Sequence, residues 1–240
     1  MTRLFCDFPL SAGTSVDLPK DLTRHIMVLR LTVGDDITLF DGTGGEYHAR
    51  ITGMERYAAK AEIFSFSPRE AELPYEITLA QGIPEAGKMD WIIEKAVELG
   101  VRKIVPLAAQ RSVVRLNTER AEKRLTRWQS IVISAAQQCG RNRLPEITQP
   151  AGFADYISSL SGKSAIMFSP RAAESLPSWA SMHAPHAVTL LIGPEGGFSP
   201  EEEALAHRQG IVSLSMGPRI LRTETAGLAA VSAINAIWEK

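Results

Sequence analysis

Cysteine is scarce in this sequence, which has only Cys6 and Cys139. Two cysteines cannot form the disulfide framework of a small secreted domain, and these two lack the C-x-x-C spacing of a zinc or redox site. Long apolar runs are missing as well. The run at 187–192 is far shorter than the about 20 residues that span a bilayer, and the first residues carry no apolar signal segment. These absences predict a soluble cytoplasmic protein with reduced thiols.

The composition is that of an ordinary globular protein. Hydrophobic residues make up 45% and charged residues 22% of the chain, and the formal net charge is −1, which excludes disorder as the main state. The 18 glycines show no triplet period, so a collagen-like chain is excluded. A length of 240 residues allows one large domain or two smaller ones.

The near-zero net charge hides a strongly basic stretch. Between Arg102 and Arg143 there are ten basic and two acidic residues, a local charge of +8, and eight of the ten are arginines. Such a run can be a solvated face, but planar guanidinium groups suit phosphate oxygens, so the excess favours a polyanionic partner. Nucleic acid is therefore a candidate partner.

The first 70 residues are predicted to be rich in β-strands. Short runs of β-branched and aromatic residues at 37–41, 47–51 and 59–66 are separated by glycine-containing turns, and a helix is expected at about 21–29. Strands at this spacing favour a small antiparallel barrel. The stretch 67–74, which contains two prolines, is typical of a linker.

After Pro74 strands alternate with helices, which predicts an α/β unit with a mainly parallel sheet. The expected strands are at 75–80, 103–107, 164–168, 188–192 and 211–216, and the expected helices at 89–99, 118–139 and 225–238. The last helix is apolar nearly all round. We therefore expect it to be covered, either by the core or by a partner.

A glycine-rich loop follows the apolar strand at 188–192. It reads Gly-Pro-Glu-Gly-Gly-Phe at 193–198 and leads into a helix start with Ser199 as N-cap, Pro200 at N1 and Glu202 at N3. Glycines at the carboxyl end of a buried strand let backbone amides approach a ligand, and ligands bind at that edge of an open α/β sheet. A tight turn that needs positive φ is the alternative. The fingerprints of dinucleotide and P-loop sites are absent.

A second loop joins the last strand to the last helix and reads Met-Gly-Pro-Arg-Ile-Leu-Arg-Thr-Glu-Thr-Ala at 216–226. Purely structural roles are open here, because Arg222 can pair with Glu224 and Thr223 or Thr225 can cap the helix. Two neighbouring strand ends with glycine-containing loops nevertheless favour a ligand site.

With these loops the chain resembles the bacterial 16S rRNA uridine-N3 methyltransferases, the RsmE family of SPOUT (trefoil-knotted) enzymes. The resemblance covers nearly the whole chain. It includes HIMVLR at 25–30, LFDG at 39–42, KMDW at 88–91, AVELG at 96–100, RSVV at 111–114 and QCGR at 138–141. Its most specific part is LLIGPEGGFS at 190–199 followed by ILRTETA at 220–226.

The resemblance implies the fold and the cofactor. It implies a PUA-like RNA-binding β-barrel at 1–72 and, at 73–240, a SPOUT methyltransferase domain: a mainly parallel sheet with helices on both faces and a C-terminal trefoil knot. It also implies S-adenosyl-L-methionine as the cofactor and no metal. The cofactor-binding residues would be Phe168, Ile192, Gly193, Gly196, Gly197, Met216, Gly217, Ile220, Leu221, Thr225 and Ala226.

Methyl transfer to uridine N3 requires help with a weakly acidic N3–H. We expect Arg222, which keeps its charge, to stabilise the developing uracil anion. Glu195 would orient ligand amino groups or act as a base, and an ion pair of Arg222 with either Glu195 or Glu224 is the structural alternative. No histidine lies in these loops, so no proton acceptor stands out. RNA would be bound by Arg30, Arg111, Arg115, Arg120, Arg124, Arg127, Arg141 and Arg143.

Two other functions remain open on the sequence alone: a SPOUT ribose 2′-O-methyltransferase acting on rRNA or tRNA, and a non-catalytic RNA-binding protein. The expected partners are 16S rRNA in the small ribosomal subunit and a second copy of the chain. Related knotted enzymes pair through helices near the knot, and the apolar helix at 225–238 suits this role. The homodimer would share its active site, with Arg111 or Arg141 of one subunit facing the cofactor of the other.

Overall fold

The computed structural model describes residues 2–85, 87–112 and 118–239. The chain forms two compact units: unit 1 comprises Met1–Glu72 and Ala136–Leu144, and unit 2 comprises Leu73–Ala135 and Pro145–Lys240. The predicted division at residue 72 therefore misses one segment, because 136–144 packs with the N-terminal residues.

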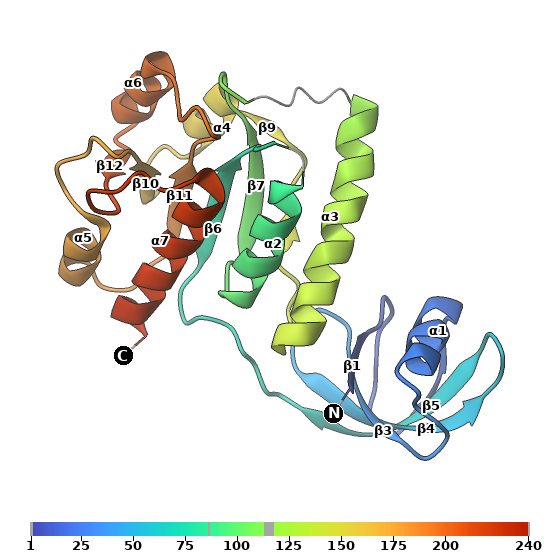
Figure 1. The fold of residues 1–240 in the computed structure, drawn as a ribbon. Coiled ribbons are helices and arrows are strands. Elements are labelled where there is room, and N and C mark those ends of the chain that lie inside the picture. The colour runs from blue at the N-terminus through green and yellow to red at the C-terminus, as the bar shows by residue number, and fades with distance from the viewer. Residues whose placement is uncertain (1, 86, 113–117, 240) are drawn as a thin grey trace. The chain divides into compact units, whose positions relative to one another are not determined.

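Unit 1 is built on a five-stranded sheet (Figure 1). Its hydrogen-bonded order is β1 (Thr2–Phe5), β3 (Asp36–Phe40), β4 (Glu46–Met54), β5 (Ala59–Ser67) and β2 (Ser15–Leu18). β1 runs parallel to β3, and the other pairs are antiparallel. The predicted strands correspond to β3, β4 and β5, and the predicted helix to α1 (Lys20–Val28).

The core of unit 1 follows from the two-residue period of its strands. Ile37 lies opposite Ala49, which lies opposite Ile63, and all three side chains are fully buried together with Leu4 and, from α1, Ile26. One face of the sheet thus covers a continuous apolar core, as expected for a small β domain.

A polar cluster attaches the segment 136–144 to the strands of unit 1. Glu46, which is 7% exposed, accepts hydrogen bonds from Arg3 and Arg69. The Asn142 Nδ2 atom donates to Arg69 O at 2.6 Å and to Glu46 Oε2 at 3.3 Å, and its Oδ1 atom accepts from Arg3. The two guanidinium groups outweigh the effect of burial and lower the pKa of Glu46 to about 2.

Unit 2 is organised around a seven-stranded parallel sheet, as predicted. Its order is β12 (Val212–Leu214), β10 (Ala165–Phe168), β11 (Val188–Ile192), β6 (Ile77–Gly82), β7 (Lys103–Ala108) and β8 (Glu146–Ile147), with β9 (Ala151–Gly152) also paired to β7. The helices are α2 (Lys88–Glu98), α3 (Thr118–Cys139), α4 (Phe153–Ser159), α5 (Leu176–Met182), α6 (Pro200–Arg208) and α7 (Thr223–Trp238).

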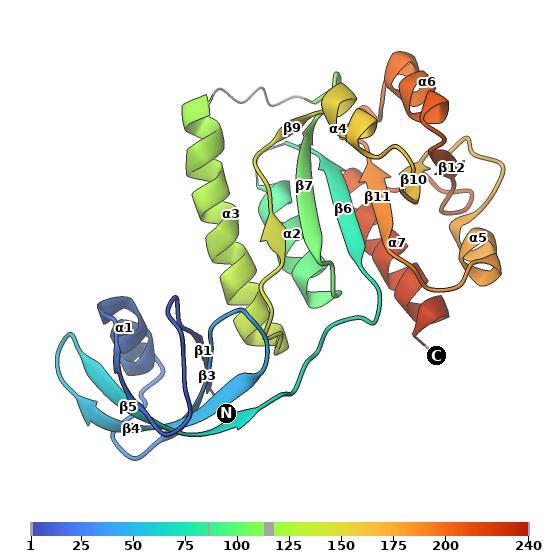
Figure 2. The same ribbon diagram turned by 180° about the vertical axis from the view of Figure 1, so that it is seen from behind.

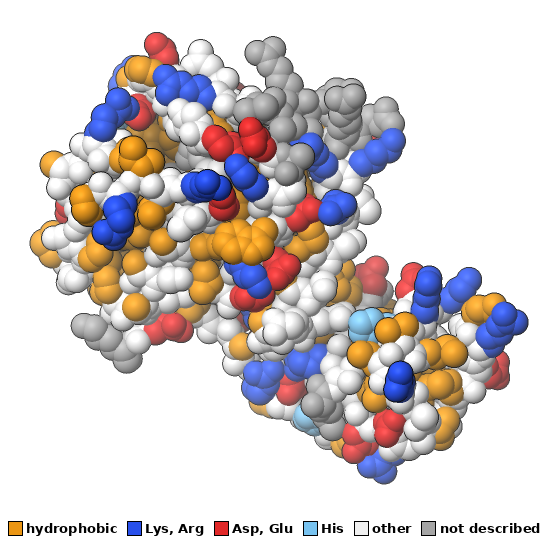
Figure 3. Space-filling model, in the orientation of Figure 1, with side chains coloured by type: hydrophobic (Ala, Val, Ile, Leu, Met, Phe, Trp, Pro, Cys, Tyr) orange, Lys and Arg blue, Asp and Glu red, His pale blue; other side chains and the backbone are white. Residues whose placement is uncertain are grey.

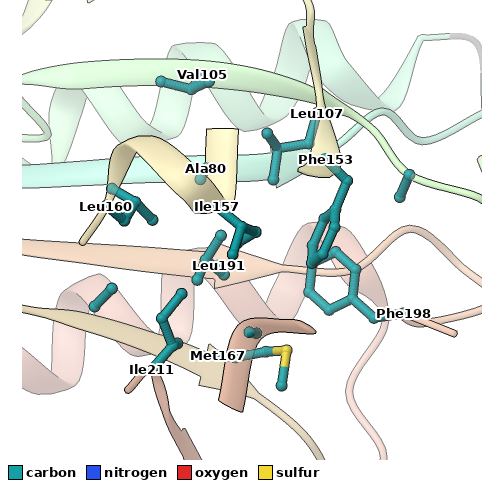
Figure 4. Close-up of a cluster of buried hydrophobic side chains, with 13 residues drawn as sticks. Ala80, Val105, Leu107, Phe153, Ile157, Leu160, Met167, Leu191, Phe198 and Ile211 are labelled. Atoms are coloured by element: carbon teal, nitrogen blue, oxygen red, sulfur yellow. The ribbon is translucent and has the colours of Figure 1, made fainter. Parts of the chain in front are cut away.

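Helices cover both faces of this sheet, which confirms the predicted α/β architecture. In Figure 1 α2 and α7 lie in front of the strands, and in Figure 2 the opposite face, with α4, is turned to the viewer. Figure 4 shows Ala80 and Leu191 in a cluster with Phe153 and Ile157 of α4. Their neighbours along the strands point the other way, toward α7.

The chain returns from the edge of the sheet to its middle after β12. The edge strand β12 pairs with β10, but α7, which follows it, packs on β11 and β6. Gly227 of α7 lies so close to the sheet that an added Cβ would stand 3.3 Å from Leu79 and 3.4 Å from Ile192. Because of this return, the loops after β11 and β12 meet above the same strand ends. Among the helices of the described residues, none is both long and apolar enough to cross a membrane.

Candidate active site

A pocket of about 650 Å³ lies at the carboxyl ends of β10, β11 and β12 in unit 2. Its wall is formed by the last residues of these strands and by the loops at 169–171, 193–198 and 216–226. The edge is the one at which parallel α/β sheets bind ligands, and the volume is in the range of small-molecule sites. Both loops that the sequence singled out therefore contribute to one cavity.

The pocket brings together most of the residues predicted to bind the cofactor or to act on the substrate. All of the predicted cofactor-binding residues line it except Gly217 and Thr225. Arg222, Glu195 and Arg111 line it as well. Gly217 and Thr225 belong to the same loop and helix start, but they do not contribute to the wall.

The glycine-rich loop is compact because its backbone folds back on itself. Gly197 N donates to Pro194 O at 2.8 Å, and Gly197 has a φ of +67°, a conformation that disfavours other residues. A Cβ on Gly193 would lie 2.9 Å from Gly197 Cα, so this contact requires glycine. The predicted capping box follows, with Ser199 and Glu202 bonded to each other's backbone amides.

A buried chain of hydrogen bonds connects the two loops. Thr223 Oγ1 accepts a hydrogen bond from Gln81 Nε2 at 2.8 Å and donates one to Gly193 O at 2.6 Å. Gln81 is fully buried, and its Nε2 atom also donates to Gly82 O. The end of β6, the first turn of α7 and the glycine-rich loop are thus held together by one hydroxyl group, which the sequence had suggested only as a helix cap.

Glu195 is held by two donors at the start of α2. Its Oε1 atom accepts from Lys88 Nζ at 2.7 Å and from Glu85 N at 3.1 Å. Burial alone would raise the pKa of Glu195, but these hydrogen bonds outweigh it and lower the pKa, while the bond to Glu195 raises the pKa of Lys88. The pair stays ionised near neutral pH, so this carboxylate anchors the loop and is a weak base.

Arg222 is left without an ion pair among the described residues, so the alternative pairing with Glu195 or Glu224 is not seen. It stands at the N-cap position of α7, is exposed and lines the pocket. Glu224, on the first turn of α7, has an Oε2 atom that is buried and has no hydrogen-bond partner in residues 2–85, 87–112 and 118–239. The third acid of the wall, Glu203, is bonded to Arg171 at 3.2 Å.

The arginines predicted to bind RNA have different environments. Arg30 is exposed and has a φ of +58°, which is rare outside glycine. Arg127 is 70% exposed and is bonded to Asp90, and Arg143 is 43% exposed and is bonded to Glu70. Arg124 is half-buried. Arg115 and the side chain of Arg120 lie outside the described residues. On the face drawn in Figure 3, basic side chains are interspersed with acidic ones.

Two of these arginine predictions need correction. The Arg141 side chain is 2% exposed and donates to both oxygens of Glu72, so it stabilises unit 1 and is not accessible to RNA or to a second subunit. Arg111 Nη1 donates to Gly196 O at 3.0 Å and to Phe198 O at 3.3 Å. It therefore supports the glycine-rich loop of its own chain, which is not the role expected for a residue facing a second subunit.

Several pocket residues were not assigned a role from the sequence. Lys88, Arg171, Arg219, Glu203 and Glu224 all line the wall. Lys88 and Glu195 are 107 positions apart, and no local pattern connects them. Only the arrangement of the strand ends shows that they meet.

Comparisons with known proteins agree with this site. The RNA methyltransferase domain family matches residues 71–235, and the RNA methyltransferase PUA domain family matches residues 18–64. The ribosomal RNA small subunit methyltransferase E of Bacillus subtilis is 33% identical to this chain, covering 98% of it and 96% of the relative. The chain belongs to the ribosomal RNA small subunit methyltransferase E family.

Other members of this family are similar over nearly their whole length. The methyltransferase E of Buchnera aphidicola is 32% identical, covering 97% of this chain and 94% of the relative. The crystal structure of methyltransferase E from Neisseria gonorrhoeae, described as bound to S-adenosyl methionine, superposes with a TM-score of 0.92. It is 40% identical and covers 99% of this chain and 98% of the other. The fold expected from the family is therefore confirmed.

Proposed function

We propose that this chain transfers a methyl group from S-adenosyl-L-methionine to N3 of a uridine in 16S rRNA, acting on the small ribosomal subunit in the cytoplasm. The observation that carries the proposal is the single pocket in which the loops at 193–198 and 216–226 meet. The family to which the chain belongs supports rRNA as the substrate class. The choice of N3 rests on the resemblance to the uridine-N3 enzymes.

The residues of the pocket fit the cofactor. Phe168, Ile192 and Leu221 supply apolar surface suited to the adenosyl group, and the glycine-rich loop presents backbone groups with space in front of Gly197, where an added Cβ would meet nothing within 4 Å. Once bound, the cofactor supplies the methyl group on a positively charged sulfur. The chain itself binds and orients it and excludes water from the reacting atoms.

Arg222 is proposed to stabilise the uracil as N3 loses its proton. Negative charge then develops on the two carbonyl oxygens beside N3, and a fixed guanidinium group stabilises such charge most where water is excluded. Arg222 suits this role because it lines the pocket and no described carboxylate neutralises it. Glu195, in contrast, is proposed to hold the glycine-rich loop through Lys88.

The N-terminal residues 1–72 are proposed to form the RNA-binding domain, and 73–240 the catalytic domain with the knot. The family match of 18–64 to a PUA domain supports the first assignment. Arg30, Arg124, Arg127 and Arg143 remain candidates for phosphate contacts, because each has at least part of its side chain exposed. N3 lies on the Watson–Crick edge of the base, so the target uridine must be unpaired or flipped out.

A homodimer is also proposed. In the single chain, α7 buries Leu228, Val231 and Ile234, whereas the opposite side of the helix, with Ser232 and Ala236, is exposed. Small side chains there would allow a second helix to approach closely. Light scattering at micromolar concentration tests the dimer, and a monomer would contradict it.

The methylation itself is tested with small ribosomal subunits from cells that lack this gene. Incubation with the protein and S-adenosyl-L-methionine should yield 3-methyluridine in nuclease digests analysed by mass spectrometry. A ribose 2′-O-methylated nucleoside would support the ribose methyltransferase instead. Binding of subunits without any methylated product, and without a calorimetric signal for S-adenosyl-L-methionine, would support an RNA-binding protein without catalysis.

A further inference from the structure

Among the described residues three carboxylates line the pocket, and one of them, Glu224, has an oxygen that is both buried and unpartnered. Glu195 is bonded to Lys88 and to Glu85 N, and Glu203 is bonded to Arg171. Glu224 Oε2 is buried and makes no hydrogen bond within the part of the chain that the structure describes. A buried acceptor without a donor is unfavourable, and because Glu224 also lines the pocket, its carboxylate points to a donor that a ligand brings.

We propose that Glu224 is the proton acceptor for methylation, taking the proton from uracil N3; this rests on the proposed function. In this step the N3–H bond breaks and its electron pair stays on the uracil. The proton forms an O–H bond with the Glu224 carboxylate. N3 then forms a bond to the methyl carbon, and the bond from that carbon to sulfur breaks with its electron pair left on sulfur. Atoms and charge balance without a further reactant.

The surroundings of Glu224 suit this role. Its charge interacts with that of the Lys88 ammonium, which favours the ionised carboxylate, the form that accepts a proton. Unlike Glu195, whose Oε1 atom is occupied by two donors, Glu224 keeps an oxygen to which none of the described residues donates. The other charged side chains of the pocket wall are Arg111, Arg171, Glu195, Glu203, Arg219 and Arg222. Arg222, the N-cap residue of α7, lies two positions before Glu224 in its first turn, which allows one short segment to stabilise the uracil anion and to take its proton.

The alternative donor for Glu224 is the amino group of the cofactor. The protein needs an acceptor for the N3 proton, and the pocket wall contains no histidine and no other carboxylate with an open buried oxygen among the described residues. A general base contributes about 10²–10⁴-fold to a rate, whereas a lost contact with the cofactor weakens its binding. The two roles therefore give different results in the same variant.

Glu224→Gln is the deciding variant, because it keeps the shape of the side chain and removes its basicity. We expect S-adenosyl-L-methionine to bind within threefold of the wild-type affinity by calorimetry, and the single-turnover rate on unmethylated small subunits to fall by about 10²–10⁴-fold. Asp155→Asn is the matched control, since Asp155 is an exposed acid in the first turn of α4 and lies outside the pocket wall. Asp155→Asn should keep the wild-type cofactor affinity and the wild-type single-turnover rate.

Two further measurements separate a proton acceptor from a residue that only maintains structure. The rate of Glu224→Gln should rise by about tenfold per pH unit around neutrality, because only uracil that has already lost its N3 proton can react, whereas the wild-type rate should rise less steeply. RNA with 5-fluorouridine at the target, whose N3–H is more acidic, should restore much of the lost rate. An unrescued variant would overturn the proposal.

The proposal also fails if Glu224→Gln methylates as fast as the wild type, or if its cofactor affinity falls tenfold or more, in which case Glu224 binds the cofactor. Both outcomes can be told apart from failure of the proposed function. If the proposed function were wrong, the wild-type protein itself would yield no 3-methyluridine.

Discussion

Thr223 Oγ1 lies 2.6 Å from Gly193 O and donates a hydrogen bond to it, although the two residues belong to different loops. The same oxygen accepts from Gln81, so its hydrogen is directed at Gly193. This contact fixes the distance between the glycine-rich loop and the first turn of α7. The shape of the pocket therefore depends on a hydroxyl group that is itself almost fully buried.

Replacing Thr223 with Val removes this hydroxyl at nearly constant volume. Gln81 Nε2 and Gly193 O each lose a buried partner, and we expect a loss of about 1–3 kcal/mol in the free energy of unfolding, with cofactor affinity reduced about tenfold. Calorimetry and denaturant titration measure the two effects. Thr126→Val is the control, since it removes an exposed hydroxyl on α3. Unchanged affinity in Thr223→Val would show that the contact does not shape the site.

Gly197 and Gly210 offer a matched comparison. Their φ angles are +67° and +77°, and an added Cβ meets nothing within 4 Å at either position. Replacing either glycine with alanine should lower the free energy of unfolding by about 1–2 kcal/mol, because both positions have a left-handed backbone conformation. Only Gly197 lines the pocket, so only Gly197→Ala should weaken S-adenosyl-L-methionine binding. Equal affinities in the two variants would show that the cofactor does not bind at this loop.

Arg141→Ala should destabilise the protein and leave the RNA contacts unaffected. Glu72 would keep a largely buried charge without its partner, which typically costs about 3–5 kcal/mol. Arg143→Ala is the comparison, because the Arg143 and Glu70 side chains are 43% and 30% exposed, and such pairs contribute at most about 1 kcal/mol. Thermal unfolding should thus separate the two variants clearly. If Arg141→Ala were as stable as the wild type but bound RNA more weakly, Arg141 would be an RNA-binding residue, as predicted from the sequence.

Arg124 and Arg127 of α3 test the phosphate contacts. If both bind phosphates, replacing them with Gln should lower the slope of log affinity against log salt by about 0.7–0.9 for each lost contact. Cofactor affinity should not change, because neither residue lines the pocket. Fluorescence titrations of an rRNA fragment at several salt concentrations measure the slope. An unchanged slope would mean that this face of α3 is only solvated.

Glu46 should make unit 1 sensitive to acid. Its pKa is 4.5 in the unfolded reference and about 2 in the folded chain, a lowered value. The corresponding stabilisation of about 3 kcal/mol is therefore complete above about pH 5 and is lost as the pH falls toward 2. Circular dichroism between pH 7 and pH 2 should show this loss. Glu46→Gln should be less stable at pH 7 and should depend less on pH over that range.

Most of the strands and helices could be predicted because they are long enough to show a period. The strand at 188–192 and the helix at 118–139 agree with β11 and α3 at both ends. β1 and β2 were missed because their four residues each, TRLF and SVDL, mix polar with apolar side chains. β10 is equally short, but it is an uninterrupted apolar run, AIMF, and was predicted. β8 and β9, with two residues each, exist only because the neighbouring strand β7 offers hydrogen bonds to them.

The candidate site could also be predicted only in part. The loops at 193–198 and 216–226 were predicted because glycine after a buried strand has a local cause. The bond of Lys88 to Glu195 and the open oxygen of Glu224 depend on which strand ends are neighbours, and no local pattern contains that order. Arg141 was misassigned because charge in a sequence does not show burial; its carboxylate partner, Glu72, lies 69 positions away.

The cluster that joins Arg3, Glu46 and Asn142 also sets an order of events during synthesis on the ribosome. Domains generally fold as units while the chain is still being made. Here the strands of unit 1 are made first, but Asn142 is added only after more than half of the chain has been translated. Until then Glu46 lacks one of its donors, and the nascent unit 1 remains incomplete. The final folding step of unit 1 therefore takes place when the end of α3 leaves the ribosome.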